Sequence, residues 1–329
     1  MSRRAFIAGV GLSALAGVGV AALRGFPTFA EAGHEFTSAL HIRAATVWGD
    51  AYAALVGAAD DHVTITRLHV GADRSVTVGE DLGVAWPHGF QPWGIAAIGE
   101  RLLVTGSLAS LFEVVTVDNR SDALPPGLRE LAGDGDPGLP DAIIDYEVWH
   151  YRPALVAVEG GRVERVALPV PNGIGWGAAT GIATDRVTKI AVAMDGCPDP
   201  DAHVITRCHL AVSADGGVTW QEQLVDRGLR EGYATTLAGD GSSFFAVTVT
   251  GEGHRTVRRG VLGTDPSLTV VDSTDGAGPV RAVVANADGG VRLFERASNS
   301  DHIIAVNGVP GTWIAATQHG ARLVSNRGE

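Results

Sequence analysis

Apolar and polar residues along this chain alternate in short runs rather than in long helical stripes. Runs such as Val63–Val70, Lys189–Met194 and Phe244–Gly251 are rich in Val, Ile, Phe and Ala, and Gly, Asp, Asn or Pro separates such runs from their neighbours. Strands of about four to eight residues produce this pattern, because successive side chains of a strand point to opposite faces. Only Pro125–Gly133 has helical character, and it is short. The sequence therefore predicts an all-β protein.

The predicted strands also repeat on a coarser scale. Aromatic or glycine-led segments precede seven pairs of strands, and their starts are unevenly spaced. Seven units in the chain that follows the first thirty residues nevertheless give about 42 residues per unit, the size of a four-stranded propeller blade. The segments are Ala45–Ala54, Gln91–Thr105, Tyr146–Val158, Gly175–Ala193, Gly232–Val247, Gly278–Leu293 and Gly311–Val324. We predict a β-propeller with seven blades, and six as the second choice. The short last unit would be completed by an outer strand from Glu35–Ile42, which closes the ring. A two-sheet sandwich, the rival fold, would need far fewer strands.

The start of the chain has the pattern of an export signal. Arg3 and Arg4 precede an apolar run that ends at Leu23, and the order Ser-Arg-Arg-x-Phe-Ile resembles the twin-arginine signal, an address that a receptor reads. Small residues at positions minus three and minus one predict cleavage after Ala30. An uncleaved membrane anchor is the alternative, because about 19 apolar residues can just span a bilayer.

Cleavage divides the chain into a signal peptide, 1–30, and one propeller domain, 31–329, secreted or at the exterior of the cell envelope and no longer inserted in a membrane. The whole chain has a net charge of −12, and the charged residues of the signal peptide are all basic, so its removal makes the net charge more negative. A chain of this charge is not expected to bind nucleic acid. The two cysteines, Cys197 and Cys208, are predicted to form a disulfide, which an oxidising exterior permits and which contributes about 2–3 kcal/mol. Two buried thiols are the alternative.

The stretch SADGGVTW carries the most specific motif. It places Ser-x-Asp-x-Gly-x-Thr-Trp at Ser213, Asp215, Gly217, Thr219 and Trp220. This pattern resembles the Asp-box, or BNR, repeat of sialidases, sortilin-type receptors and related propellers, and Asn286–Leu293 is a weaker echo of it. In that family the boxes lie at outer hairpins, away from the ligand-binding mouth. We therefore expect a turn in which the Asp accepts backbone hydrogen bonds, Gly supplies positive φ and Trp packs between blades.

The resemblance to sialidases would also imply a glycoside hydrolase site. Sialidases bind a carboxylate with three arginines and use a tyrosine nucleophile paired with a glutamate, with an aspartate as acid/base. The early Phe/Tyr-Arg-Ile-Pro motif of that family has no match here. If the chain is an exo-acting, sialidase-like enzyme, its catalytic candidates are Tyr233, Glu231, Arg230 and Asp145. Packing of Tyr233 between blades is the alternative interpretation.

Other site chemistry is sparse in the sequence. Asp134, Asp136 and Asp141 could offer oxygen ligands to Ca²⁺, but the loop lacks the terminal Glu of a complete calcium-binding pattern, so a solvated acidic loop is favoured. The histidines form no pair at metal-ligand spacing. No phosphate-binding loop and no Gly-x-Ser-x-Gly nucleophile motif is present. We expect no metal and no cofactor.

Two functions from different classes remain. The favoured one is a non-catalytic binding or scaffold protein that recognises a glycan, a peptide or a partner protein at the central mouth. The alternative is a secreted sialidase-like hydrolase with a divergent site in that mouth, so enzymatic activity stays open. Both place function where the chain enters the inner strands. The ligand-binding candidates there are Trp93, Glu147, Trp176, Arg281 and Trp313.

Overall fold

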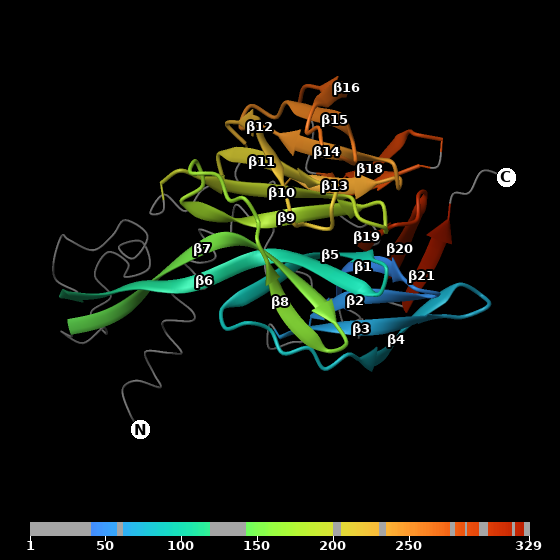
Figure 1. Ribbon diagram of the computed structural model, residues 1–329, viewed down its shortest axis with the longest axis horizontal. Helices are drawn as coiled ribbons and strands as arrows, with labels where there is room; N and C mark the ends of the chain where they lie inside the picture. The colour runs from blue at the N-terminus through green and yellow to red at the C-terminus, as the bar shows by residue number, and fades with distance from the viewer. Residues whose placement is uncertain are drawn as a thin grey trace.

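The all-β prediction is confirmed by the computed structural model. The structure describes residues 41–57, 62–118, 143–199, 205–229, 235–276, 280–286, 288–295, 302–317 and 320–325. All regular elements within these ranges are β-strands, and they are grouped in small sheets (Figure 1). A helix able to span a membrane is not found in this part of the chain. Many of the strands coincide with apolar runs of the sequence, and their inward residues are buried between sheets.

Strands that follow one another in sequence pair antiparallel into meander units. Unit two contains β5 (Phe90–Ile98), β6 (Arg101–Asp118), β7 (Ile143–Glu159) and β8 (Arg162–Val166). Unit three contains β9 (Trp176–Thr184), β10 (Ile190–Cys197), β11 (Arg207–Ser213) and β12 (Gln221–Arg227). Unit four contains β13 (Thr236–Gly239), β14 (Ser243–Val249), β15 (Arg255–Val261) and β16 (Leu268–Thr274), and unit five contains β17 (Val280–Ala285) and β18 (Val291–Glu295).

The first and last units join in one barrel-like sheet. Unit one consists of β1 (His41–Trp48), β2 (Ala51–Gly57), β3 (Val63–Val70) and β4 (Ser75–Asp81), and unit six of β19 (His302–Asn307), β20 (Thr312–Thr317) and β21 (Gly320–Ser325). Strand β1 pairs parallel with β19, and β4 pairs antiparallel with β21. The Asn307 side chain, at the end of β19, also donates a hydrogen bond of 2.6 Å to the Ile95 carbonyl of β5. Units one and six are therefore joined by strand pairing, and unit six is also hydrogen-bonded to unit two.

The first strands of successive units contact one another in the order β1, β5, β9, β13, β17, β19 and back to β1. Apolar side chains fill each junction, and every such buried side chain stabilises the fold by about 1.5–3 kcal/mol. The apolar cluster at each of five junctions contains residues of both neighbouring units, namely Leu55 and Val104, Leu103 and Ile182, Leu210 and Phe244, Phe245 and Val283, and Ile314 and Ile42. Units five and six meet through Phe294 and Trp313, whose ring centroids are 5.3 Å apart. This closed ring of meanders is a β-propeller.

The preference for seven blades is not confirmed, because the described residues form six units. The segment Tyr146–Val158 does not open a unit of its own; it belongs to β7 and pairs with β6 over its whole length. The two strands extend as a long hairpin beyond the rest of unit two (Figure 1). Likewise, Gly311–Val324 supplies the second and third strands of unit six, whose first strand is β19.

The N-terminal strand closes the ring in a different way from the one expected. His41 and Ile42 begin β1, the first strand of unit one, and do not form an outer strand of the last unit. The rest of the segment proposed for that role lies outside the described residues. Closure still depends on this strand, because Ala45 and Thr46 of β1 pair with Val306 and Asn307 of β19.

Candidate functional site

Units two, three and four begin close together at one end of the ring, which we call the mouth. Its described residues are Phe90–Trp93 at the start of β5, Ile174–Trp176 at the start of β9, and Thr235 just before β13. Trp93 packs against the apolar cluster that contains Trp176, so the first two segments are in contact. The third is fastened to unit three by a hydrogen bond from the Thr235 backbone, described below.

Aromatic side chains form a packed group at the mouth. Trp176 is 1% exposed, and the Tyr151 ring meets it edge to face at a centroid distance of 6.4 Å. Burial raises the pKa of the Tyr151 hydroxyl. Trp93 is half-buried and occupies a β-bulge between Pro92 and Gly94, where the register of β5 shifts. A bulge re-aims the side chain that it carries, and Trp93 and Tyr151 are the partly exposed members of this group, whereas Trp176 is buried.

A fully buried carboxyl group connects three segments behind this aromatic group. Asp195, in β10, accepts hydrogen bonds at Oδ2 from the Thr180 hydroxyl, at 2.9 Å, and from the Thr235 backbone N–H, at 2.5 Å. Thr180 occupies a bulge of β9, as Trp93 does in β5. Burial raises the pKa of Asp195, and the bond from Thr235 opposes part of that rise. Asp195 therefore joins β9 and β10 to the start of β13.

Asp195 is one end of a polar row across unit three. Cys208 of β11 is directly opposite Asp195 of β10 and also directly opposite Asp226 of β12, so all three are on one face of the sheet. Burial, reinforced by the Asp195 charge, raises the pKa of the Cys208 thiol well above its ordinary value. Nucleophilic attack requires a thiolate, so this cysteine is unsuited to catalysis near neutral pH.

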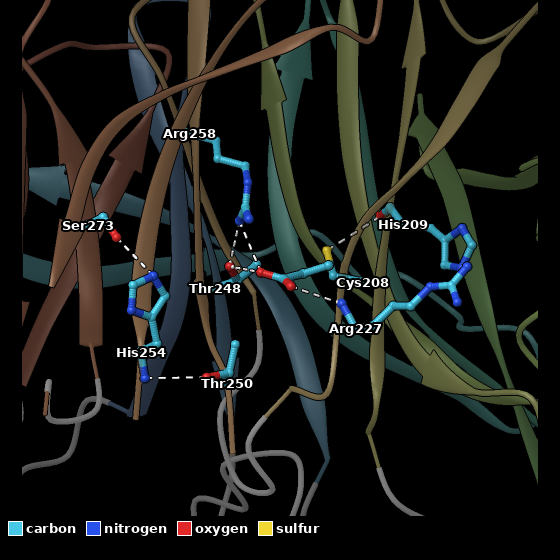
Figure 2. A network of polar contacts seen from close by, with 9 residues as sticks. Cys208, His209, Arg227, Thr248, Thr250, His254, Arg258 and Ser273 are labelled. Carbon is cyan, nitrogen blue, oxygen red and sulfur yellow. Dashed lines mark hydrogen bonds and ion pairs between the residues drawn. The ribbon is translucent and has the colours of Figure 1, made fainter. Parts of the chain in front are cut away.

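The far end of the row binds unit four. Arg258 Nη1 is 3.1 Å from Asp226 Oδ2, and both side chains are 16% exposed. The Thr248 hydroxyl donates to the same oxygen at 2.8 Å and accepts from Arg258 Nη1 at 2.8 Å. Figure 2 shows Arg258 and Thr248 on one side of this junction and Cys208 on the other. Since Asp195 is completely buried and Asp226 is paired, the row holds units three and four together and thereby shapes the mouth.

The expected disulfide is wrong: Cys197 and Cys208 are both buried thiols. Cys208 is directly opposite Asp195, two residues before Cys197 on β10, so the cysteines are diagonal neighbours. Diagonal neighbours in a sheet are about 7–8 Å apart, longer than the Cα separation that a disulfide spans. The Cys197 thiol instead donates to the Asp199 carbonyl at 2.8 Å.

The Ser213–Trp220 stretch forms a closed turn between β11 and β12. Asp215 Oδ1 accepts from the N–H groups of Val218 and Thr219, at 3.1 and 2.8 Å, and Oδ2 accepts from the Thr219 hydroxyl at 2.6 Å. These bonds, the Thr219 hydroxyl first, lower the pKa of Asp215 to about 2. Gly217 has a φ of +91°, which only glycine adopts without strain. Both carboxylate oxygens of Asp215 thus accept hydrogen bonds from residues of the same turn.

Trp220 follows the turn and connects it to the core. Its indole N–H donates to the Gly217 carbonyl at 3.0 Å, and its ring packs on the apolar cluster shared by units two and three. The indole is half-buried. Trp220 therefore covers part of the junction between units two and three.

The other predicted site residues are distributed as follows. Trp313 is 7% exposed and packs on Phe294, so it fills a junction between units. Asp145 and Glu147 are in β7 and Arg281 is in β17, and only their backbone positions are described. The remaining candidates lie outside the described residues: Arg230, Glu231, Tyr233, Asp134, Asp136 and Asp141. In the described part of the chain, no group of three or more His, Cys, Asp or Glu side chains is placed to hold a metal ion.

Sequence reasoning missed the polar row. The available signal was Asp195 itself, an acid inside the apolar run Ile190–Cys197, where a charged residue requires partners. Its partners could not be identified in the same way, since Thr180 and Thr235 belong to other strands or units.

Comparisons with known proteins give similarity in fold only. No family model and no curated protein matches the chain. A gluconolactonase from Xanthomonas campestris matches with 12% identity over 89% of this chain and 93% of its own, at a TM-score of 0.41. A GH43 β-xylosidase/α-arabinofuranosidase from a compost metagenome matches with 9% identity over 89% of this chain and 93% of its own, at a TM-score of 0.43. A Trypanosoma rangeli sialidase matches with 9% identity over 86% of this chain and 54% of its own, at a TM-score of 0.41. Such low identities and TM-scores carry no conclusion about activity or substrate.

Proposed function

We propose that this chain is an exported propeller of the Asp-box type that binds a glycan at its mouth without catalysing a reaction. The observation that carries this proposal is the half-buried Trp93, placed on a bulge beside the packed pair Tyr151 and Trp176. Ligand sites combine apolar and aromatic walls with a few polar groups, and an indole face suits the apolar face of a sugar ring. A peptide or a partner protein is the other kind of ligand that this surface could take.

Export rests on the pattern around Arg3 and Arg4 and on the expected cleavage after Ala30. The Asp-box assignment rests on the bonds that Asp215 makes within its own turn. In this proposal that turn is architecture, because its carboxylate is occupied by local donors. The buried Asp195 also has no direct contact with a ligand and acts by fixing the position of Thr235.

A screen of the secreted chain tests this function. We expect a glycan array that includes sialylated and neutral glycans to show specific binding, and a fluorogenic 4-methylumbelliferyl sialoside to remain intact in the same preparation. N-terminal sequencing of the secreted chain should give Glu31 as its first residue. Turnover of the sialoside that disappears in the Tyr233→Phe variant would contradict the proposal and support the sialidase-like alternative. A folded chain that binds no array glycan would rule out the glycan-binding function.

A further inference from the structure

Unit four carries a chain of three polar side chains at its exposed rim. His254 Nδ1 is 2.6 Å from Asp275 Oδ1, and His254 Nε2 is 2.8 Å from the Ser273 hydroxyl. Ser273 and Asp275 therefore engage the two different nitrogens of one imidazole ring. Figure 2 shows the Ser273 hydroxyl directed at the ring of His254. The three side chains are apart from the polar row that joins units three and four.

Local structure fixes the imidazole between its two partners. His254 ends the turn that connects β14 to β15, and this turn is closed by a 3.0 Å bond from the Thr250 N–H to the His254 carbonyl. The His254 N–H returns a 3.3 Å bond to the Thr250 hydroxyl. The next residue, Arg255, pairs with Thr274 of β16, which places Ser273 and Asp275 on either side of that pairing position. Backbone register thus brings the three side chains together.

The order of contacts assigns a role to each group. A carboxylate can only accept, so Asp275 accepts from Nδ1–H, and Nε2 of the neutral ring is then left as the acceptor of the Ser273 hydroxyl. A serine that donates to an imidazole oriented by a carboxylate is the arrangement of an activated nucleophile, which is recognised by geometry and not by sequence order. We propose that Ser273, His254 and Asp275 form a hydrolytic site for small carboxylic esters with good leaving groups.

The openness of the site determines its substrate class. His254 is 43% and Asp275 92% exposed, and Ser273 is exposed on β16, the terminal strand of the unit-four sheet among the described strands. A small ester reaches Ser273 here without a pocket.

The reaction balances with water as the only co-reactant. Ser273 Oγ attacks the ester carbonyl carbon while its proton moves to His254 Nε2. The tetrahedral intermediate then collapses, the bond to the leaving alkoxide breaks, and Nε2–H protonates that alkoxide. Water, deprotonated by Nε2, then attacks the carbonyl carbon of the acyl-serine. The second intermediate collapses, the bond from that carbon to Ser273 Oγ breaks, and Nε2–H returns its proton to Oγ, which releases the carboxylic acid and restores the serine. Asp275 is a positioning residue, and water screens its charge because it is exposed.

Labelling with a fluorophosphonate probe tests the site in the complete folded chain. We expect one adduct by intact mass, mapped to Ser273 by peptide analysis, together with slow hydrolysis of p-nitrophenyl acetate. Ser273→Ala should abolish the adduct, and His254→Ala should slow labelling by about 100-fold, as loss of a general base does. Asp275→Asn should slow it by less than about tenfold, since the exposed charge is screened.

Ser267 provides the matched control. Its hydroxyl bonds to Asp265 in the same unit but has no histidine partner, so Ser267→Ala should label and hydrolyse as the wild type does. A thermal melt of each variant shows that it is folded, and the exposed positions of both serines make large losses of stability unexpected. Failure of the folded wild type to label above a heat-denatured control, an adduct at another residue, or labelling unaffected by His254→Ala would overturn the proposal.

Discussion

Replacing Trp176 with alanine is expected to lower the free energy of unfolding by about 3–5 kcal/mol, the usual cost of truncating a buried aromatic side chain. Trp176 is 1% exposed and packs with Ala178, Cys197 and Leu229 in a cluster to which Trp93 also contributes. Its removal leaves a cavity lined by residues of several strands, which cannot all move inward together. Urea unfolding followed by circular dichroism measures the loss.

Trp220→Ala is the control for that measurement. Trp220 is half-buried beside the Asp215 turn, so its removal exposes part of a junction to water without leaving an enclosed cavity. We expect a smaller loss than for Trp176→Ala. Equal losses for both variants, or a larger one for Trp220→Ala, would contradict the difference in burial between the two tryptophans.

Asp195 should make the fold less stable as the pH rises. Burial raises its pKa in the folded protein above the ordinary value of 3.8. Above pH 3.8 the unfolded chain releases this proton while the folded chain keeps it, so the free energy of unfolding falls until the folded pKa is passed and then levels off. Each unit of pKa difference corresponds to about 1.4 kcal/mol. Asp195→Asn replaces the acid with a neutral group of the same shape and should remove this decline.

Urea unfolding at about pH 4 and about pH 8 provides the test, because the decline begins near pH 3.8, so that the first value lies at its start and the second well above it. The wild type should be more stable relative to Asp195→Asn at the lower pH. Asp215→Asn is the control: its pKa of about 2 means that the Asp215 carboxylate stabilises the fold above pH 3.8 and loses this effect only as the pH falls through 2, so the difference between wild type and Asp215→Asn should change little between pH 4 and pH 8. The same difference between wild type and Asp195→Asn at both pH values would contradict the account.

Asp195→Ala should destabilise the fold by about 1–3 kcal/mol for each donor left without an acceptor.

The sequence predicted those features that short stretches of chain determine. Strands follow from the alternation of apolar residues, and the Asp215 turn follows from donors and acceptors within Ser213–Trp220. Features that depend on distant pairing were not accessible in this way. Tyr146–Val158 has the pattern of a first strand, and only its pairing with β6, across the long connection 119–142, shows that it belongs to unit two.

The same limit applies to the candidate site. The spacing of Cys197 and Cys208 gives a loop length, whereas disulfide formation depends on a register that places Asp195 opposite Cys208. Trp176 and Trp313 were predicted at the mouth because they begin apolar segments, but burial between units is decided by neighbours from other parts of the chain. His254 and Ser273 meet only through the pairing of β15 with β16.

The most direct test compares Trp93→Ala with Asp215→Ala for binding to the strongest glycan found on the array, at a temperature where both variants are folded. Contacts between two aromatic rings contribute about 0.5–1.5 kcal/mol beyond their buried area; if the contact of a sugar ring with the Trp93 indole is of this size, Trp93→Ala should weaken the affinity by about 2- to 12-fold. Asp215→Ala should melt at a lower temperature and bind as the wild type does, because the turn is away from the mouth. If Asp215→Ala abolishes binding without lowering the melting temperature while Trp93→Ala binds normally, the ligand site is at the turn and the account is wrong.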